Sequence, residues 1–317
     1  MRTGLSLVIL CAAAMLTACS SKKTDNQQII SAQQDKALQG LEDSMRNIAG
    51  AYPGEIGVAL ITDRGDTLTV NNEDKYPLMS VFKLHQAISI CRLFEKESRS
   101  LDTVVSIDRA SLNPHTWSPM LKEIPDDPIK ISIKDLLRYT LAQSDNNASN
   151  WLFENVEGVQ QTDSLIATII PRESFRLSVT EAEMWDNHEL SYDNHSSPLG
   201  ASILIDRLFN DSITGKENAD FIRTTLQECK TATDRIAAPF AGRENVAIGH
   251  KTGSGFRNEA GILSAHNDVA HIILPSRRSY SLAVLVKDFN GSEAEAASAI
   301  SRISSAVYQA MEKQERQ

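Results

Sequence analysis

The spacing of hydrophobic residues along the chain alternates between a helical and a strand-like pattern. Near the beginning, apolar residues recur every three or four positions, which predicts a helix over residues 33–49. Residues 55–62 then alternate apolar and polar side chains, and after a turn at 63–66 the alternation returns in 67–70. Two alternating runs joined by a short turn predict a β-hairpin.

Between residues 80 and 230 the alternating pattern nearly disappears, and helical spacing dominates. The helices expected there are 80–96, 133–141, 146–154, 199–209 and 220–229. The segment 171–198 between them is long, polar and irregular. A loop of that length inside a compact domain is usually functional, and we expect it to be an omega-type loop.

Strand patterns return near the end of the chain, before an amphipathic helix rich in Ala and Ser. The strands are expected at 246–250, 260–265, 269–274 and 280–286, and the helix at 292–312. Strand-forming segments therefore lie at both ends of the chain and helices lie in the middle.

The simplest arrangement is a mixed α/β (α+β) fold. One antiparallel sheet is built from both termini and carries flanking helices, and an all-helical domain is inserted into it. We expect the sheet domain to comprise 35–79 and 231–317 and the helical domain to comprise 80–230. A functional site is expected where the two parts meet.

The composition of the 317-residue chain is that of an ordinary globular protein, with 41% hydrophobic and 23% charged residues. It excludes a disordered chain, a collagen-like fibre and a multi-span membrane protein. The formal net charge is -9 and there is no basic stripe, so we expect no nucleic-acid partner. Four cysteines are too few for a disulfide scaffold, and the seven histidines show no paired metal-ligand spacing. We therefore expect neither a metal nor another cofactor.

The first residues are typical of an export signal rather than of the fold. A basic residue precedes an apolar run over 5–16, which is too short to span a membrane. The run ends in Leu-Thr-Ala-Cys, which resembles the lipobox of bacterial lipoproteins. The resemblance implies a signal peptide over 1–18, lipidation of Cys19 and a polar tether over 19–34. We expect the protein in the periplasm, held at a membrane only by that lipid; the alternative is an ordinary secretory signal with a chance cysteine.

Two cysteines remain once the leader is set aside. Cys91 lies on the apolar face of a predicted helix, so we expect a buried structural thiol. The spacing of Cys91 and Cys229 fits no metal motif, and we expect no disulfide between them.

Ser80 and Lys83 form the first candidate for chemistry. They are three residues apart at the start of a predicted helix, so both side chains lie on one face. Lys83 can take the serine proton, and free N–H groups at the helix start can bind an oxyanion. The pattern alone is weak, because Ser20 and Lys23 share it and because Ser80 could simply cap the helix.

Two further motifs strengthen this candidate. In Ser144-Asp145-Asn146 the serine hydroxyl can relay a proton and Asn146 can hold a substrate amide, although an ordinary helix cap is the alternative. In Lys251-Thr252-Gly253-Ser254 the lysine and the two hydroxyls can bind a carboxylate, and the glycine allows close approach. The alternative there is a glycine-rich strand end.

Taken together and in this order, the three motifs resemble those of class A β-lactamases and penicillin-binding proteins, and the resemblance extends over residues 35–313. It implies that Ser80 attacks a lactam carbonyl and that the backbone N–H groups of Ser80 and Ser254 stabilise the oxyanion. Ser144 and Lys83 would relay the proton to the lactam nitrogen. The substrate carboxylate would be held by Lys251, Thr252 and Arg235. Small β-lactams would be the only partners of a monomeric enzyme.

Four segments of the chain, 113–119, 181–184, 192–194 and 198–201, are similar to a PER-like subgroup of that family that favours cephalosporins. Glu181, in the long loop, matches the glutamate that activates the deacylating water, and either it or Lys83 could be the acylation base. Trp117 would form an aromatic wall at the mouth of the site; the alternative is an ordinary half-buried tryptophan. Arg235 matches a carboxylate-binding position, with a solvated surface arginine as the alternative.

Two positions depart from the family pattern in the long loop. Most class A enzymes carry an asparagine four residues after the glutamate, whereas this chain carries Trp185, which can only donate a hydrogen bond. Most also carry an arginine two residues before the glutamate, where this chain has Val179, so no ion pair can close the loop. Glu183 is a weaker candidate for the role of Glu181. Both departures predict a rearranged loop.

Two other functions fit parts of the sequence. A penicillin-binding D,D-carboxypeptidase or transpeptidase would share the nucleophile, but it would not need Glu181. A non-catalytic lipoprotein could keep the fold as a binding module, but every expected catalytic residue type is in place. The sequence therefore favours a class A serine β-lactamase.

Overall fold

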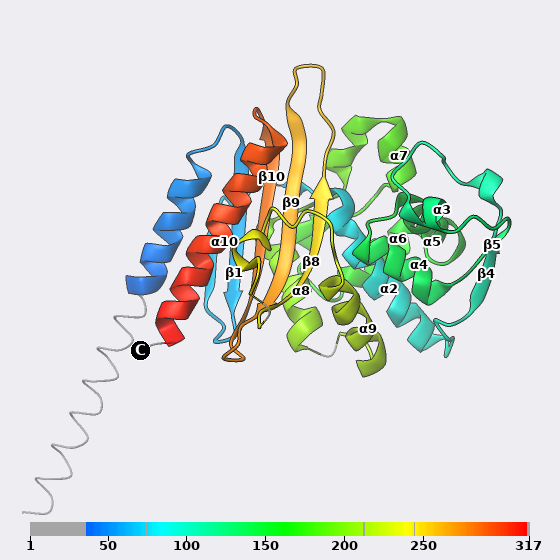
Figure 1. Ribbon diagram of the computed structural model, residues 1–317, viewed down its shortest axis with the longest axis horizontal. Coiled ribbons are helices and arrows are strands. Elements are labelled where there is room, and N and C mark those ends of the chain that lie inside the picture. The colour runs from blue at the N-terminus through cyan, green and yellow to red at the C-terminus, as the bar shows by residue number, and fades with distance from the viewer. Residues whose placement is uncertain (1–35, 74, 212, 244, 316–317) are drawn as a thin grey trace, which may run out of the picture.

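A five-stranded antiparallel sheet forms the centre of the computed structural model, which describes residues 36–315 except 74, 212 and 244 (Figure 1). Its strands are β1 (Glu55–Thr62), β2 (Thr67–Val70), β8 (Ala247–Ser254), β9 (Leu263–Ile273) and β10 (Ser279–Phe289). The strand order is β2-β1-β10-β9-β8. Because β1 pairs with β10, the two ends of the chain share one sheet, and the predicted hairpin and fold class are confirmed.

The prediction of two separate strands at 260–265 and 269–274 is wrong, because β9 runs through both. The hydrophobic pattern breaks at Asn267 and Asp268, yet both residues are fully buried. Asn267 donates to the carbonyl oxygen of Pro77 at 2.6 Å, and Asp268 accepts from the backbone N–H of Ile236 at 3.0 Å. Polar side chains whose hydrogen bonds are satisfied can lie inside a strand without ending it.

Two helices cover one face of the sheet, and they come from opposite ends of the chain (Figure 1). Residues 36–49 form one helix and α10 (Glu293–Glu315) forms the other. Met45 and Ile300 belong to the buried cluster between them and the sheet. The predicted signal peptide, the tether and Cys19 lie outside the described residues. None of the helices between residues 36 and 315 has the length and apolar character needed to cross a membrane.

Helices from the middle of the chain cover the other face and extend beyond it (Figure 1). They are α2 (Phe82–Lys96), α3 (Pro119–Glu123), α4 (Ile133–Ala142), α5 (Asn146–Asn155), α6 (Val159–Ile166), α7 (Glu181–Asp186), α8 (Pro198–Asn210) and α9 (Lys216–Gln227). The five helices predicted in this region are present, whereas α3, α6 and α7 were not predicted. Helix α8 packs on β1 and β10, where a Cβ at Gly57 would lie only 2.5 Å from the Pro198 ring. The boundaries between the sheet domain and the helical domain stay a prediction.

The remaining connections contain short strands and 3-10 turns. The strands are β3 (Tyr76–Pro77), β4 (Val104–Ile107), β5 (Ile129–Ser132), β6 (Phe175–Arg176) and β7 (His195–Ser196), and the 3-10 turns are η1 (Met79–Val81), η2 (Arg109–Ser111), η3 (Arg172–Ser174), η4 (His188–Asp193) and η5 (Ala238–Phe240). Most of these strands are too short to show a period of two, so the sequence pattern missed them. The segment 171–198 is consequently not irregular, since it contains two of these strands, two of the turns and helix α7.

The long loop is closed by an asparagine instead of an ion pair. Asn194 is fully buried, and its Oδ1 accepts from the backbone N–H groups of Ser178 at 2.8 Å and Val179 at 3.1 Å. Its Nδ2 donates to the carbonyl oxygen of Val179 at 2.8 Å. The missing arginine at position 179 is thus compensated by backbone hydrogen bonds to one side chain.

Both described cysteines are free thiols. Cys91 is fully buried on α2, as predicted, and Cys229 is partly exposed after α9.

Candidate active site

Ser80 lies in the turn η1, immediately before α2. The preceding residue, Met79, has a positive φ of 46°, a conformation that costs free energy for a residue with a Cβ. Strand β8 packs directly against this turn, because a Cβ at Gly253 would lie 2.5 Å from the carbonyl oxygen of Leu78. Ser80 makes no capping hydrogen bond at the start of the turn or of α2. Its hydroxyl is therefore available to the site.

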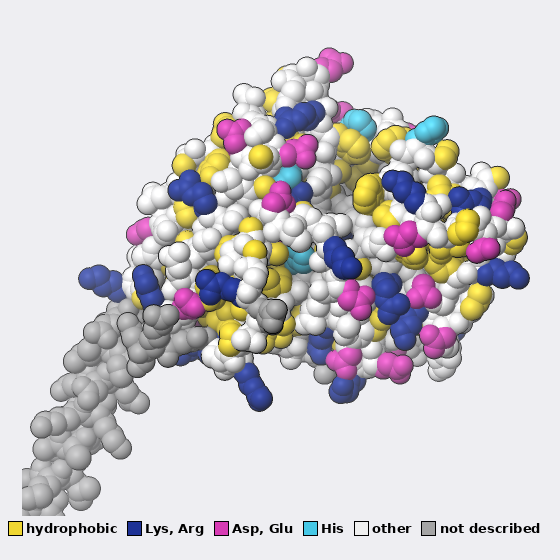
Figure 2. Space-filling view, in the orientation of Figure 1, with side chains coloured by type: hydrophobic (Ala, Val, Ile, Leu, Met, Phe, Trp, Pro, Cys, Tyr) yellow, Lys and Arg dark blue, Asp and Glu magenta, His cyan; other side chains and the backbone are white. Residues whose placement is uncertain are grey.

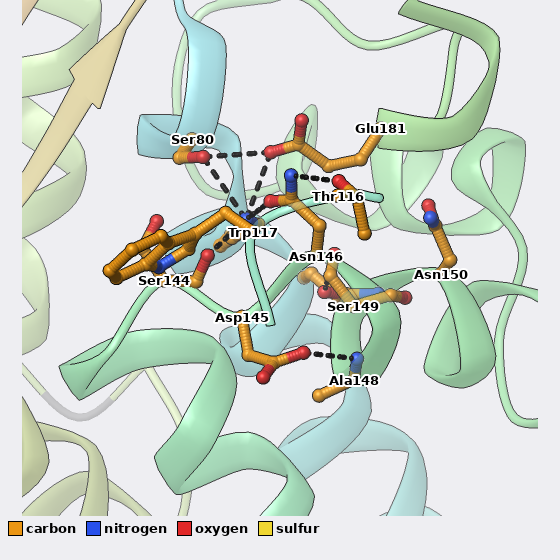
Figure 3. A network of polar contacts seen from close by, with 12 residues as sticks. Ser80, Thr116, Trp117, Ser144, Asp145, Asn146, Ala148, Ser149, Asn150 and Glu181 are labelled. Atoms are coloured by element: carbon orange, nitrogen blue, oxygen red, sulfur yellow. Dashed lines mark hydrogen bonds and ion pairs between the residues drawn. The ribbon is translucent and has the colours of Figure 1, made fainter. Parts of the chain in front are cut away.

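The buried ammonium of Lys83 contacts polar groups from several segments of the helical part. Its Nζ donates to the Ser80 hydroxyl at 3.0 Å, the carbonyl oxygen of Ser144 at 2.9 Å and Asn146 Oδ1 at 2.6 Å. It also forms an ion pair of 2.9 Å with Glu181. Ser80 in turn donates directly to Glu181 Oε1 at 2.7 Å. Figure 3 shows the side chains of Ser80, Glu181 and Asn146 converging on one point.

The second motif supplies both a helix cap and site residues. Asp145 accepts from the backbone N–H of Ala148 at 2.8 Å and so caps α5, as the alternative interpretation expected, and it points away from Ser80 (Figure 3). Ser144 has a positive φ of 57°, which turns its hydroxyl toward the third motif. Asn146 donates from Nδ2 to Thr116 Oγ1 at 2.8 Å. The cap thus leaves its two neighbours free for chemistry.

Lys251 brings a second buried ammonium to the site from strand β8. Its Nζ donates to Ser144 Oγ and to the carbonyl oxygen of Thr252, both at 3.0 Å. Burial, followed by the positive charge of Lys83, lowers the pKa of Lys251 to about 7. This lysine can therefore exchange a proton with Ser144 near neutral pH.

Arg235 is a buried residue, so the alternative of a solvated surface arginine is wrong. Only 4% of it is exposed. Its guanidinium donates to the carbonyl oxygens of Gly253 at 3.0 Å and Asn267 at 2.6 Å, and to Ser254 Oγ at 2.6 Å. It thus lies against the end of β8, where the third motif presents its hydroxyls.

These groups surround a cavity of about 400 Å³ between the sheet and the helical part. Its lining includes Ser80, Trp117, Ser144, Asn146, Glu181, Trp185, Thr231, Arg235, Thr252 and Ser254. The two lysines lie behind this lining. In the space-filling view the surface is hollowed between these two parts, and positive and negative side chains are interspersed on this face (Figure 2).

Two tryptophans stand at the cavity with large exposed fractions. Trp117 is 54% exposed and donates from its indole to the carbonyl oxygen of Gln143 at 2.9 Å. Trp185 is 41% exposed, at the position where the family carries an asparagine. Both indoles line the cavity, and the role of Trp117 as an aromatic wall stays a prediction.

Glu183 takes no part in the site. Its carboxylate accepts from the backbone N–H and the hydroxyl of Thr180, at 2.7 Å and 3.0 Å, and so completes a capping box at the start of α7. Among the described residues there is also no group of three or more His, Cys, Asp or Glu side chains that could hold a metal ion.

Three functional neighbours were not singled out from the sequence. Thr116 holds the amide of Asn146, Asn194 closes the long loop, and Thr231 shares a hydrogen bond of 2.9 Å with Thr252. Thr116 and Asn194 lie in segments that resemble the subgroup, but no role could be given to either, because both act through contacts between distant parts of the chain. Thr231 acts in the same way.

Comparisons with known proteins agree with this geometry. The model of the beta-lactamase enzyme family matches residues 40–311. A β-lactamase of Phocaeicola vulgatus is 54% identical over 84% of this chain and 84% of its own length. The extended-spectrum β-lactamase PER-1 of Pseudomonas aeruginosa is 28% identical over 85% and 86% of the two chains. A solved class A β-lactamase from Bacteroides cellulosilyticus, 30% identical, superposes with a TM-score of 0.81 over 87% of this chain and 98% of that one.

Proposed function

This chain belongs to the beta-lactamase enzyme family, within it to class A, and from that premise we propose that it opens the β-lactam amide through an acyl-enzyme on Ser80. The observation that carries the proposal is the direct hydrogen bond of 2.7 Å from the Ser80 hydroxyl to Glu181. A serine hydroxyl that already donates its hydrogen bond to a carboxylate base is the arrangement that activated serines need.

Glu181 is the better candidate for the acylation base. The Lys83 ammonium has three N–H bonds and lies within reach of four oxygens, on Ser80, Ser144, Asn146 and Glu181. A group that serves so many acceptors acts as a donor rather than as a base. Its ammonium instead stabilises the developing alkoxide of Ser80.

The close packing of β8 on η1 supports the proposed oxyanion hole. Gly253 allows this approach, so the N–H groups of Ser80 and Ser254 can face one substrate carbonyl. The lactam nitrogen then receives its proton from the Ser144 hydroxyl, which Lys251 resupplies over 3.0 Å.

Electrostatics favour an anionic substrate at the β8 end of the cavity. Lys251, Thr252 and Arg235 meet there, and the buried guanidinium of Arg235 orients the hydroxyl of Ser254. A carboxylate of a cephalosporin or penicillin fits this set of donors. The exposed ring of Trp117 forms the opposite wall, against which the acyl side chain of the substrate lies.

Deacylation uses Glu181 a second time. Once Ser80 carries the acyl group it has no proton left to donate, so the carboxylate oxygen that accepted from it becomes available to a water molecule. A positioned base of this kind contributes typically 10²–10⁴-fold to the rate. Rapid removal of the acyl group is what distinguishes a β-lactamase from a penicillin-binding protein.

Turnover of a chromogenic cephalosporin by the purified enzyme tests the proposed reaction. Steady hydrolysis is expected. A single stoichiometric burst would instead support a penicillin-binding protein, and no reaction would support a binding module.

We also propose that the enzyme is a lipoprotein of the periplasm, anchored through Cys19. The support is the Leu-Thr-Ala-Cys junction and the polar segment that follows it. Membrane fractionation of cells that express the wild type or Cys19→Ala tests this proposal. The wild type should sediment with membranes and the variant should be released, because stable attachment needs the acyl chains. Equal solubility of the two forms contradicts lipidation.

A further inference from the structure

Cys229, His250 and Asp268 form a chain of polar contacts outside the active-site cavity. His250 precedes Lys251 in β8, so the two side chains point to opposite faces of the sheet. His250 Nδ1 lies 3.0 Å from Asp268 Oδ1, and the imidazole lies close enough to the Cys229 thiol for each group to shift the pKa of the other. A thiol beside an imidazole that a buried carboxylate orients is the arrangement of an activated cysteine nucleophile.

Charge stabilises the thiolate at this place. Burial alone would raise the pKa of Cys229, but the hydrogen bond and charge of His250, with Lys251 nearby, lower it to about 7. Burial opposes the charged form of His250 as well, yet Asp268 and Cys229 raise its pKa to about 10. The other described cysteine behaves oppositely, because burial raises the pKa of Cys91 far above its usual range.

The Cys229 thiol is also partly accessible to solvent, and positively charged groups lie near it. Cys229 is partly exposed, whereas Cys91 is fully buried. The negative charge of Cys229 acts on the buried guanidinium of Arg235, whose Nε has no hydrogen-bond partner. Reactive cysteines are typically found in such partly exposed, electropositive places.

A hydrogen-bonded path connects this thiol to the substrate site. Cys229 Sγ lies 3.2 Å from Thr231 Oγ1, and Thr231 Oγ1 lies 2.9 Å from Thr252 Oγ1. Both threonines line the cavity at the end where the substrate carboxylate is proposed to bind. A group attached to the sulfur would therefore displace Thr231 and disturb Thr252.

We propose that Cys229 is a modification site for small disulfides and that the attached group weakens substrate binding. The thiolate attacks one sulfur of the disulfide, the sulfur–sulfur bond of the small molecule breaks, and a new sulfur–sulfur bond forms to Cys229. The other half leaves as a thiolate and takes a proton from the solvent. The small disulfide is the oxidant, and a dithiol reverses the step.

Intact-mass spectrometry of the purified enzyme, incubated with oxidised glutathione, tests the modification. One mixed disulfide is expected in the wild type and in Cys91→Ser, and none in Cys229→Ser. At pH 6 a thiol with a pKa near 7 is about one-tenth thiolate, roughly 30-fold more than an ordinary thiol with a pKa near 8.5. The labelling rate should thus have its midpoint near pH 7, and His250→Gln should move that midpoint above about pH 8.

A native enzyme that stays unlabelled, or a wild-type midpoint above about pH 8, would overturn the proposal and leave Cys229 a structural thiol. Labelling of urea-unfolded protein confirms that Cys91 and Cys229 are both reduced at the start. These readouts need no β-lactam, so they stand or fall independently of the proposed catalytic mechanism.

Steady-state kinetics test the coupling to the substrate site. The labelled wild type should show a KM for a cephalosporin raised about tenfold, and dithiothreitol should restore the original value. Cys229→Ser should keep the unlabelled KM before and after the same treatment. A stoichiometric adduct with unchanged KM would overturn the coupling.

Discussion

Two buried lysines approach Ser144 from opposite sides of the site, and their surroundings differ. Lys83, on α2, lies among four oxygens, one of which belongs to the carboxylate of Glu181. Lys251, on β8, has hydrogen bonds to two uncharged oxygens, those of Ser144 and Thr252. Burial and the charge of Lys83 lower the pKa of Lys251 to about 7.

Lys83 and Lys251 therefore have different roles, although they are residues of the same type. Lys83 is saturated with acceptors and paired with the carboxylate of Glu181, so it acts as a hydrogen-bond donor and electrostatic partner beside Ser80. A lysine without a paired carboxylate gives up its proton near neutral pH, so Lys251 can feed Ser144 and respond to an anionic substrate. The helical side thus prepares the nucleophile, while the strand side binds substrate and delivers a proton.

The largest effect is expected from replacing the two lysines with the same neutral residue. Lys83→Met removes the charge that stabilises both the Ser80 alkoxide and Glu181, and kcat should fall by about 10³-fold. Lys251→Met is the matched control from the other side, and it should raise KM more than it lowers kcat. Steady-state kinetics with a cephalosporin measure both. A larger loss of kcat in Lys251→Met would reverse the assignment of roles.

A smaller effect is expected from replacing Lys251 or Arg235, the two cationic side chains on the strand side of the site. Lys251→Ala should raise KM for cephalosporins by roughly tenfold to a hundredfold, since a charge-assisted hydrogen bond is worth about 1.5–3 kcal/mol. Arg235→Ala should raise KM less, because its guanidinium already donates to two carbonyl oxygens and to Ser254. If KM is unchanged in Arg235→Ala, that residue supports β8 and does not bind substrate.

The long loop offers a way to perturb the helical side alone. Asn194→Ala leaves the buried N–H groups of Ser178 and Val179 without their acceptor, and it should reduce the free energy of unfolding by about 1–3 kcal/mol. Because this loop carries Glu181, kcat should fall while KM for the carboxylate end changes little. Thermal unfolding and kinetics provide the measurements. A selective rise in KM would show that the loop acts on the strand side.

The pH dependence of KM should give the smallest effect. The folded pKa of Lys251 is lowered to about 7, so its cationic form is present below pH 7 and is lost as the pH rises through that value. The affinity for a substrate carboxylate should therefore fall as the pH rises above 7, by at most about tenfold per pH unit. KM of the wild type should therefore rise above pH 7, and KM of Lys251→Ala should be flat there. A wild-type KM that falls over this range contradicts the proposed cationic role.

The sequence predicted the parts of the site that lie within short motifs. Ser80 and Lys83 share a helix face through their spacing alone, and Lys251 and Thr252 follow one another on a strand. It also predicted the sheet, because β1 and β2 alternate on either side of a short turn and β10 is a mostly apolar run. These features depend on neighbours a few residues away, so a single sequence contains enough information.

Features that depend on distant contacts could not be predicted in this way. Asn194 closes the loop through backbone groups fifteen or sixteen residues earlier, and no sequence pattern marks such a pairing. The polar pair Asn267 and Asp268 interrupts a hydrophobic pattern in β9, but its hydrogen-bond partners lie on other segments. The contact of His250 with Cys229 likewise needs the chain to be folded.

The role of Glu181 in removing the acyl group is the central claim, and one mass measurement tests it most directly. Glu181→Ala is mixed with a cephalosporin, and the intact protein is weighed over time. Acylation should be slower without this carboxylate, but Lys83 still stabilises the Ser80 oxygen, so the ester can form, whereas no group on the loop side remains to activate water. We predict an adduct that accumulates on Ser80 and is absent from Ser80→Ala. Glu183→Ala, whose carboxylate caps α7, should turn over as the wild type does. Turnover of Glu181→Ala at the wild-type rate without any adduct would contradict the account.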